Sequence, residues 1–386
     1  MVDQKIGLTL SGGGARGAYQ AGVLKAISDL CGFKKSPFDI ISGVSAGSIN
    51  GMALAAGAQD FAAATQLMWD TWIELRVNKI FKTDLFSMAH ITSSWLLNLS
   101  LGEWVSTRKV TYLLDSSPLK ELLTKKIDMG AIGENLRSGL LHGVALSATD
   151  YRSGKSVTFF DGNQAIPDWD RNSGIGKRTI LATEHIMAST AIPIFFPPVR
   201  IGKSDYGDGG IGQSSPLSPA IRLGADRIMV IGLEHMPGHE EADSVESEQE
   251  ITLGDIAGTL LNSLFLKTLD SDVMRLKQTN KLLSAFSSEQ LRSDEIHLIP
   301  LPALFIRPSK DLGKIDMDQF ARFPYPLRHL LKGLGINDFR AWDLLSYLAF
   351  EKEYALALLE LGYKDAINSK NQIVGFFNEN QAFVGS

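Results

Sequence analysis

The stretch LTLSGGGARGAYQAGVL, residues 8–24, places a glycine-rich turn between an apolar segment and a helix-like segment. Gly12, Gly14 and Gly17 have the spacing Gly-x-Gly-x-x-Gly, which in a strand–turn–helix unit is typical of dinucleotide pyrophosphate binding. That interpretation also requires an acidic residue about 20 positions further on, at the end of the second strand. Here the nearest acid, Asp39, stands at the beginning of the second apolar stretch. The dinucleotide interpretation therefore fails, and we expect the backbone amides of these glycines to bind a different anion.

The second apolar stretch, FDIISGVS, runs into the pentapeptide GVSAG, residues 43–47. A Gly-x-Ser-x-Gly between a buried strand and a helix is the setting of a nucleophile elbow, in which the serine stands on a sharp turn with its Oγ exposed. Glycine at Gly43 and Gly47 removes side chains that would collide with the strand and the helix. The pattern therefore predicts that Ser45 is a nucleophile.

The two turns belong to neighbouring strand–turn–helix units, and we expect them at the same edge of a parallel sheet. A tetrahedral intermediate on the serine would carry an oxyanion, which needs preorganised donors. Backbone N–H groups at a helix start, free of side chains, can supply them. The anion predicted for the glycine turn is thus a transient oxyanion, bound by Gly12, Gly13 and Gly14.

Strand-like and helix-like segments alternate along the chain, which predicts an α/β fold with a mostly parallel central sheet and helices on both faces. We expect a core over residues 1–240 with a helical insertion at about 78–138, and a mainly helical C-terminal extension over 241–386 packed on the core. The insertion holds a Trp- and Leu-rich segment from Trp95 to Trp104. Two interpretations of this segment stay open: core packing of the inserted helices, and a lid or membrane-docking surface over the site.

Composition places the chain among ordinary globular proteins, with 386 residues, 44% hydrophobic and 21% charged. The net charge of −5 argues against a nucleic-acid partner. Cys31 is the single cysteine, so no internal disulfide is predicted. Without an apolar run of about 18 residues, no spanning helix is expected. We predict a cytoplasmic protein whose membrane contact, if any, is peripheral, and the sequence does not predict its oligomeric state.

Four motifs together resemble the patatin-like phospholipase family: SGGGARGAYQAGVL, GVSAGSING, ASTAIPIFFPPV and DGG at 208–210. The resemblance spans about residues 6–235 and is interrupted by the insertion. It implies a lipid acyl hydrolase with a Ser–Asp dyad, in which Ser45 is the nucleophile and Asp208, expected in a hairpin-like turn, is the base. It also implies that Gly12, Gly13 and Gly14 form the oxyanion hole, with Arg16 in the family's basic position beside it.

The predicted function is therefore a serine lipid acyl hydrolase, similar to a phospholipase A or lysophospholipase, that cleaves carboxylic esters through an acyl-Ser45 intermediate. Its partner is a lipid ester substrate, and no metal or organic cofactor is implied. Two alternatives are an acyltransferase that uses the same acyl-enzyme and a catalytically idle lipid-binding protein. A triad with His235, His297 or His329 also stays open. The C-terminal extension offers no functional residue.

Overall fold

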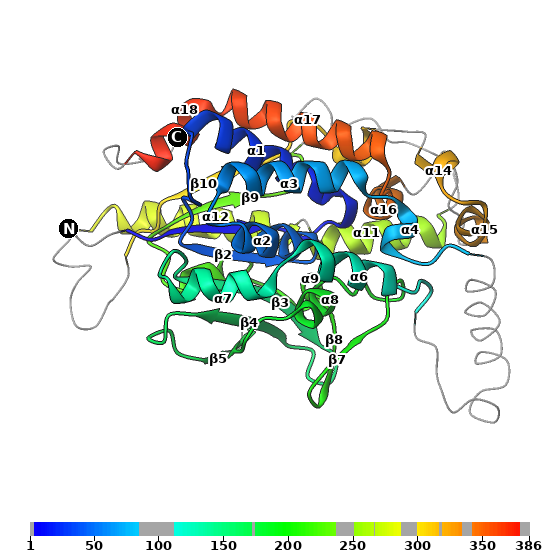
Figure 1. Cartoon of the computed structure of the whole chain (residues 1–386), viewed down its shortest axis with the longest axis horizontal. Helices are drawn as coiled ribbons and strands as arrows, with labels where there is room; N and C mark the ends of the chain where they lie inside the picture. The colour runs from blue at the N-terminus through cyan, green and yellow to red at the C-terminus, as the bar shows by residue number, and fades with distance from the viewer. Residues whose placement is uncertain are drawn as a thin grey trace.

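A mixed, mostly parallel sheet forms the centre of the chain (Figure 1). The computed structural model describes residues 4–84, 112–171, 174–236, 251–265, 267–286, 299–315, 319–333 and 342–378. The sheet has the strand order β10-β9-β1-β2-β3-β4-β6-β5, and β8 pairs with both β3 and β7. The strands are β1 (Ile6–Leu10), β2 (Ile40–Val44), β3 (Gly143–Asp150), β4 (Ser156–Gly162), β5 (Trp169–Arg171), β6 (Gly174–Arg178), β7 (Val199–Ile201), β8 (Ser204–Asp208), β9 (Arg227–Ile231) and β10 (Ala303–Ile306). Strands β10, β9, β1, β2 and β3 are parallel neighbours.

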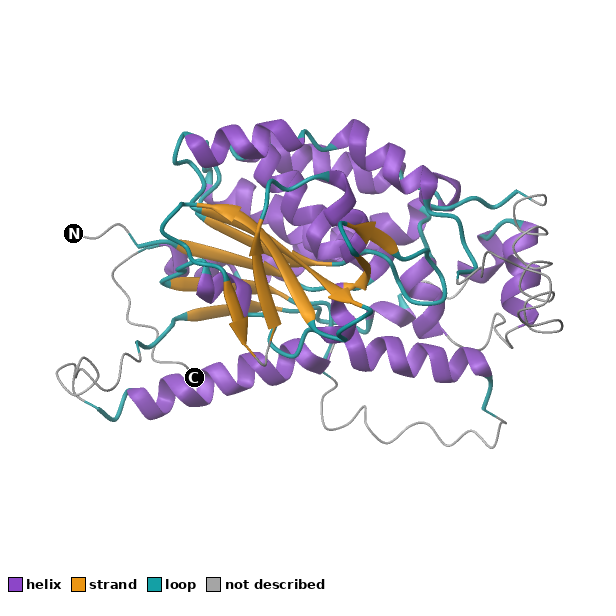
Figure 2. Ribbon diagram, turned by 90° about the horizontal axis from the view of Figure 1, so that it is seen from below, coloured by secondary structure: helices purple, strands orange, loops and turns teal. Residues whose placement is uncertain are grey.

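Helices cover both faces of the sheet, as Figure 2 shows. The period of two along a buried strand explains this arrangement. On β9, Met229 and Ile231 belong to one hydrophobic core, whereas Ile228 and Val230 belong to the other. The predicted α/β class with helices on both faces is confirmed. The helices before residue 240 are α1 (Ala18–Cys31), α2 (Ala46–Ala56), α3 (Phe61–Glu74), α4 (Val77–Ile80), α6 (Ser117–Lys126), α7 (Met129–Arg137), α8 (Thr183–Ser189), α9 (Gly209–Gly212) and α10 (Ser218–Arg222), with a short 3₁₀ helix η1 (Gly14–Gly17) before α1.

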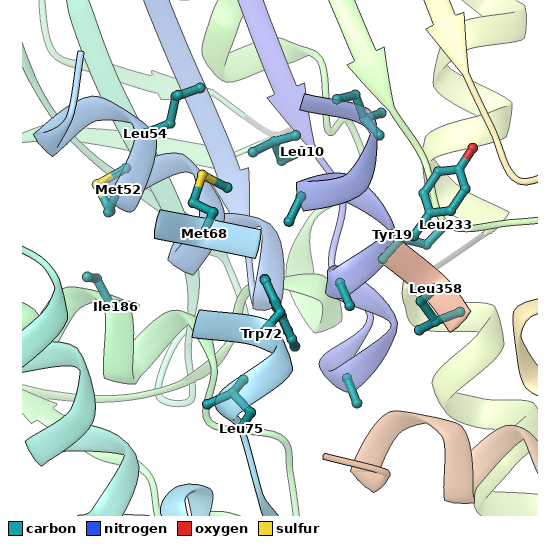
Figure 3. Close-up of a cluster of buried hydrophobic side chains, with 14 of the residues drawn as sticks. Leu10, Tyr19, Met52, Leu54, Met68, Trp72, Leu75, Ile186, Leu233 and Leu358 are labelled. Carbon is teal, nitrogen blue, oxygen red and sulfur yellow. The ribbon is translucent and has the colours of Figure 1, made fainter. Parts of the chain in front are cut away.

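The larger core lies between the sheet and helices α1, α2 and α3 and is shown in Figure 3. Leu10 at the end of β1, Tyr19 of α1 and Trp72 of α3 contribute to it, and each is at most 4% exposed. Burying large side chains of this kind stabilises the fold by about 1.5–3 kcal/mol each. The core thus fixes the helices that begin at the two turns singled out in the sequence.

The register of β1 against β2 places those two turns at one edge of the sheet. Leu10 lies opposite Gly43, and the residues that follow each of them leave the sheet together. Asp39 stands at the opposite edge, where its carboxylate accepts a 2.7 Å hydrogen bond from the backbone N–H of Ile6. The acid that a dinucleotide site would need is therefore at the wrong end of the strand, as the sequence indicates.

The C-terminal part of the chain contributes to the sheet as well as to the helical layers. Its strand β10 pairs in parallel with β9. Its helices are α11 (Leu253–Phe265), α12 (Lys267–Leu283), α14 (Gln319–Arg322), α15 (Tyr325–Gly333), α16 (Trp342–Leu348), α17 (Lys352–Asn368) and α18 (Lys370–Phe377), with a short 3₁₀ helix η3 (Leu312–Lys314). Helix α17 lies along α1 (Figure 1). The N-terminal and C-terminal parts of the chain therefore share one core.

Two predicted features of the insertion have different outcomes. The described residues after position 112 form α6 and α7, which agrees with a helical pattern. The segment from Trp95 to Trp104 lies outside the described residues. Within the described ranges, every helix is too short or too polar to cross a bilayer.

Glycines allow the close approach of α1 and α17. A side chain at Gly22 would overlap the carbonyl oxygen of Leu359, and one at Gly362 would overlap that of Tyr19. We expect Gly22→Ala to lower the free energy of unfolding by about 1–3 kcal/mol, because two backbones would have to move apart. Urea unfolding followed by circular dichroism measures this change.

Gly133 of α7 provides the matched control, since the nearest atom to an added methyl is the end of the Arg137 side chain, 3.2 Å away. Gly133→Ala should raise the stability by up to about 1 kcal/mol through helix propensity alone. Equal stabilities of Gly22→Ala and the wild type would show that the two helices are not in close contact.

Candidate active site

Ser45 occupies a strained turn between β2 and α2. Its φ of 52° and ψ of −126° lie in a region that residues with a side chain rarely adopt, at a cost of about 1–3 kcal/mol. A side chain at Gly43 would overlap the backbone of Gly47, and one at Gly47 would overlap the backbone of Leu10. The flanking glycines are therefore required for the reason that the sequence pattern suggests.

The structure brings Ser45 and Asp208 together, although they are 163 positions apart in the chain. The Ser45 hydroxyl donates a 2.6 Å hydrogen bond to Asp208 Oδ2. The backbone N–H of Gly210 donates to Oδ1 of the same carboxylate at 2.9 Å. Asp208 was expected in a hairpin-like turn, but it is the last residue of β8 and the N-cap of α9. The hairpin of β7 and β8 turns earlier, between Ile201 and Ser204, and Asp208 follows at the far end of β8.

Burial dominates the electrostatics of Asp208, whose exposed fraction is 0%. Desolvation of the charged form raises the pKa of Asp208 to about 7, whereas the hydrogen bonds from Ser45 and Gly210 act in the opposite direction. The carboxylate is thus a stronger base than an ordinary aspartate, whose pKa is about 3.9.

A hydroxyl that sequence analysis did not single out holds the backbone of the serine turn. The Ser45 N–H donates to Ser189 Oγ at 2.9 Å, and the Ser189 hydroxyl donates to the Ser147 carbonyl at 2.7 Å. Thr149 likewise donates from its hydroxyl to the Asp208 carbonyl at 2.7 Å. These bonds tie both residues of the pair to β3. Ser189 lies within the stretch ASTAIPIFFPPV, which offered the only signal for it.

The glycine turn after β1 is packed from two sides. Gly14 has a φ of +57°, and a side chain on it would overlap the Tyr347 carbonyl oxygen of α16. Gly13 has an extended φ of 164°, and an added methyl would lie 2.5 Å from Leu233 Cδ1. Gly12 lies directly before them, Gly13 is the N-cap of η1, and η1 begins at Gly14. The first N–H groups of a helix lack acceptors within that helix.

Arg16 is buried within η1, with an exposed fraction of 2%. Its Nε donates a 2.8 Å hydrogen bond to Ser346 Oγ of α16. The guanidinium therefore contacts the C-terminal part of the chain, a set of partners that the motif itself does not indicate.

A cavity lined mainly by apolar side chains reaches both turns, since Ser45 and Gly14 are among its lining residues. Helices α2, α3 and α6 together supply most of the wall, and the sequence did not predict this arrangement. Its apolar lining residues are Ala46, Ile49, Ala53, Ala64, Leu67, Met68, Trp72, Leu75, Ile80, Leu119, Leu122, Leu123, Ile127, Ile192, Phe196 and Phe350.

The described contacts of His185, His235 and His329 are with residues other than Ser45 and Asp208. His185 is mostly buried, accepts a 3.0 Å bond from the Ala182 N–H at Nδ1 and packs on a phenylalanine ring. Burial lowers the pKa of His185. His235 Nδ1 lies 3.2 Å from the Pro308 carbonyl oxygen, and His329 stacks on a tyrosine ring. His297 is outside the described residues. No cluster of three or more His, Cys, Asp or Glu suited to a metal ion occurs in the described ranges.

The sheet and the strained serine turn on it define an α/β protein with a nucleophile-elbow geometry. The profile of the family described as Patatin-like phospholipase matches residues 8–221. This chain belongs to the patatin-like phospholipase family.

Known proteins similar to this chain include a cGAMP-activated phospholipase of Pseudomonas aeruginosa, 28% identical over 210 residues, which are 54% of this chain and 53% of the relative. The chain thus spans about half the length of this curated relative. Among solved structures, VipD of Legionella pneumophila has a TM-score of 0.37 and 14% identity, covering 96% of this chain and 67% of VipD. Human GIVD cytosolic phospholipase A2 has a TM-score of 0.42 and 15% identity, covering 97% of this chain and 59% of that protein.

The packing of the glycine turn distinguishes its two central residues. We expect Gly14→Ala to destabilise the protein by about 1–2 kcal/mol more than Gly13→Ala, because a positive φ disfavours a side chain and the neighbouring atom is a backbone oxygen. Gly13→Ala meets a leucine side chain instead, which can rotate. Thermal unfolding of the two variants measures the difference. The opposite order would contradict the proposed contact with Tyr347.

Proposed function

We propose that this chain is a serine lipid acyl hydrolase that cleaves carboxylic esters through an acyl-Ser45 intermediate. The observation that carries the proposal is the 2.6 Å hydrogen bond from the Ser45 hydroxyl to the buried Asp208 carboxylate. Family membership supports the reaction class. The apolar cavity at Ser45 suits the hydrocarbon chain of a lipid, whose transfer from water is favourable.

In the first step, Asp208 accepts the hydroxyl proton while Ser45 Oγ attacks the ester carbonyl carbon. The tetrahedral intermediate collapses to the acyl-enzyme, and protonated Asp208 returns the proton to the departing alcohol oxygen. In the second step, water gives a proton to Asp208 and attacks the acyl carbon. Collapse then releases the fatty acid, and protonated Asp208 returns its proton to Ser45 Oγ, which restores the serine hydroxyl. A base with a pKa of about 7 suits both directions of proton transfer.

The negative charge formed in each step needs donors placed before the reaction. We propose the N–H groups of Gly12, Gly13 and Gly14 for this role, because Gly14 and Ser45 line the same cavity. Their turn also precedes a helix start, where the backbone dipoles favour an anion. Such donors act on the transition state more than on the bound substrate.

The first test replaces the members of the pair. Ser45→Ala, Asp208→Asn and the double variant should all be close to inactive on a short-chain ester, because the two side chains move one proton and their losses do not add. Asparagine keeps the shape of Asp208 and can accept the Gly210 N–H bond, so the variant should stay folded. Initial rates, together with circular dichroism, give the comparison.

Histidine variants serve as controls for a triad. His235→Ala, His297→Ala and His329→Ala should keep most activity, and one as inactive as Ser45→Ala would replace the dyad with a triad. Mass spectrometry of a fluorophosphonate adduct should locate the label on Ser45. Product analysis with an added alcohol distinguishes ester transfer from hydrolysis, and lipid binding without turnover of any ester would favour an idle binding protein.

The pH profile tests Asp208 independently. Because the carboxylate acts in its ionised form and its pKa is raised to about 7, kcat/KM should fall as the pH drops below about 7. An uncharged short-chain ester removes titration of the substrate. A profile that stays flat down to pH 5 would show that the group has an ordinary pKa in the free enzyme or is not the base.

A further inference from the structure

Helix α16 lies against the glycine turn and contacts it through backbone and side-chain atoms. The Tyr347 carbonyl oxygen occupies the space that a side chain on Gly14 would need. The Arg16 guanidinium lies over the Tyr347 ring, 4.4 Å from its centroid, while its Nε donates to Ser346 Oγ at 2.8 Å. The planar guanidinium thus combines a directed hydrogen bond with stacking, which a lysine cannot reproduce.

A third residue joins this contact from α11. Asn262 Oδ1 accepts hydrogen bonds from Arg16 Nη1 at 3.4 Å and from the Tyr347 hydroxyl at 2.9 Å. We name Arg16, Asn262, Ser346 and Tyr347 the loop clamp. All its members except Arg16 come from residues beyond 240, the part of the chain that showed no functional residue in its sequence.

The same segment continues into the wall of the cavity. Phe350, two residues after α16 ends, lines the cavity together with Ser45. Its ring is stacked on Trp72 of α3 at a centroid distance of 6.5 Å and an angle of 11°. One short stretch of the chain therefore touches both the glycine turn and the surface that faces the serine.

We propose that the loop clamp holds the glycine turn in its oxyanion-binding geometry, and that Arg16 is a positioning residue rather than a ligand of the substrate's polar group. The proposal rests on the proposed function of Ser45 and the glycine turn. Arg16 is only 2% exposed, and its guanidinium is held by its contacts with Ser346, Asn262 and Tyr347. Because Arg16 belongs to η1, which begins at Gly14, holding its side chain in place also restrains the backbone of the glycine turn.

The magnitude of the effect follows from the geometry of oxyanion binding. Loss of one oxyanion donor costs roughly 10²–10³ in kcat, and a misplacement of about 1 Å in a positioned group can cost about 10². Ground-state binding of an ester in the apolar cavity depends little on these donors. A loosened clamp should therefore lower kcat and leave KM nearly unchanged.

The experiment compares Arg16→Lys, Ser346→Ala and Asn262→Ala with the wild type, using kcat, KM and the rate of fluorophosphonate labelling on one uncharged short-chain ester and one phospholipid. We expect Arg16→Lys and Ser346→Ala to lower kcat and the labelling rate at least about tenfold on both substrates, with KM within about twofold. Asn262 is only partly buried, so Asn262→Ala should fold and provides a second test if Ser346→Ala does not fold. We expect it to lower kcat and the labelling rate as well, by a smaller factor.

Arg227→Lys is the matched control. Arg227 also links the core to the C-terminal part, donating to the Phe376 carbonyl at 2.7 Å and lying 5.9 Å from the centroid of that ring. It does so at the start of β9, at the opposite edge of the sheet from the glycine turn. Its variant should lose stability without a specific loss of kcat.

Two outcomes overturn the inference. Wild-type kcat in a folded Ser346→Ala or Asn262→Ala variant would show that the clamp does not position the turn. A rise in KM confined to the phospholipid in Arg16 variants, rescued by lysine, would assign Arg16 to a charged polar group of the substrate. Failure of the proposed function is separate, because activity retained by Ser45→Ala would refute it whatever the clamp variants show.

Discussion

The parallel pairing of β1 with β2 is the constraint on which the candidate site depends. Because Leu10 lies opposite Gly43, the glycine turn and the serine turn leave the sheet side by side. They approach so closely that a side chain at Gly47 would overlap the backbone of Leu10, and one at Gly17 would lie 2.8 Å from Ala46 Cβ. The glycines are therefore explained by the packing of two turns, before any role in catalysis is assigned to them.

The buried carboxylate of Asp208 illustrates a conflict between stability and chemistry. Its described hydrogen-bond donors are a hydroxyl and a backbone amide. Burial raises its folded-state pKa from 3.8 to about 7, so its contribution to stability falls as the pH rises from about 4 toward 7, where the unfolded chain ionises more readily. The same burial makes the carboxylate a better base. The buried carboxylate of Asp208 and the strained backbone of Ser45 both lower stability, so neither is favoured by folding alone.

The sequence predicted those features of the structure that short stretches of chain determine by themselves. The alternation of strands and helices and the two glycine-flanked turns follow from periodicity and from the conformational freedom of glycine, which are properties of short stretches. Asp208 was predicted only from the resemblance to the patatin-like family, because residue spacing does not indicate which acid, 163 positions from Ser45, will lie beside it. Ser189 illustrates the same limit, since one serine in an apolar stretch looks like any other until tertiary structure places it beside the Ser45 amide. The cavity wall from α2, α3 and α6 depends on packing between distant elements.

Arg16 shows why the part of the chain beyond the family match belongs to the same structural unit as the site. The matched region ends at residue 221, yet Ser346, which follows much later, accepts a hydrogen bond from this arginine. A buried guanidinium without partners would cost far more than a lost surface contact. A buried arginine therefore requires hydrogen-bond acceptors and benefits from an aromatic ring against its guanidinium. Ser346 and Asn262 provide the acceptors, and Tyr347 provides the ring. Because β10 also extends the sheet beside β9, removing the C-terminal part would expose a strand edge and a charged turn together.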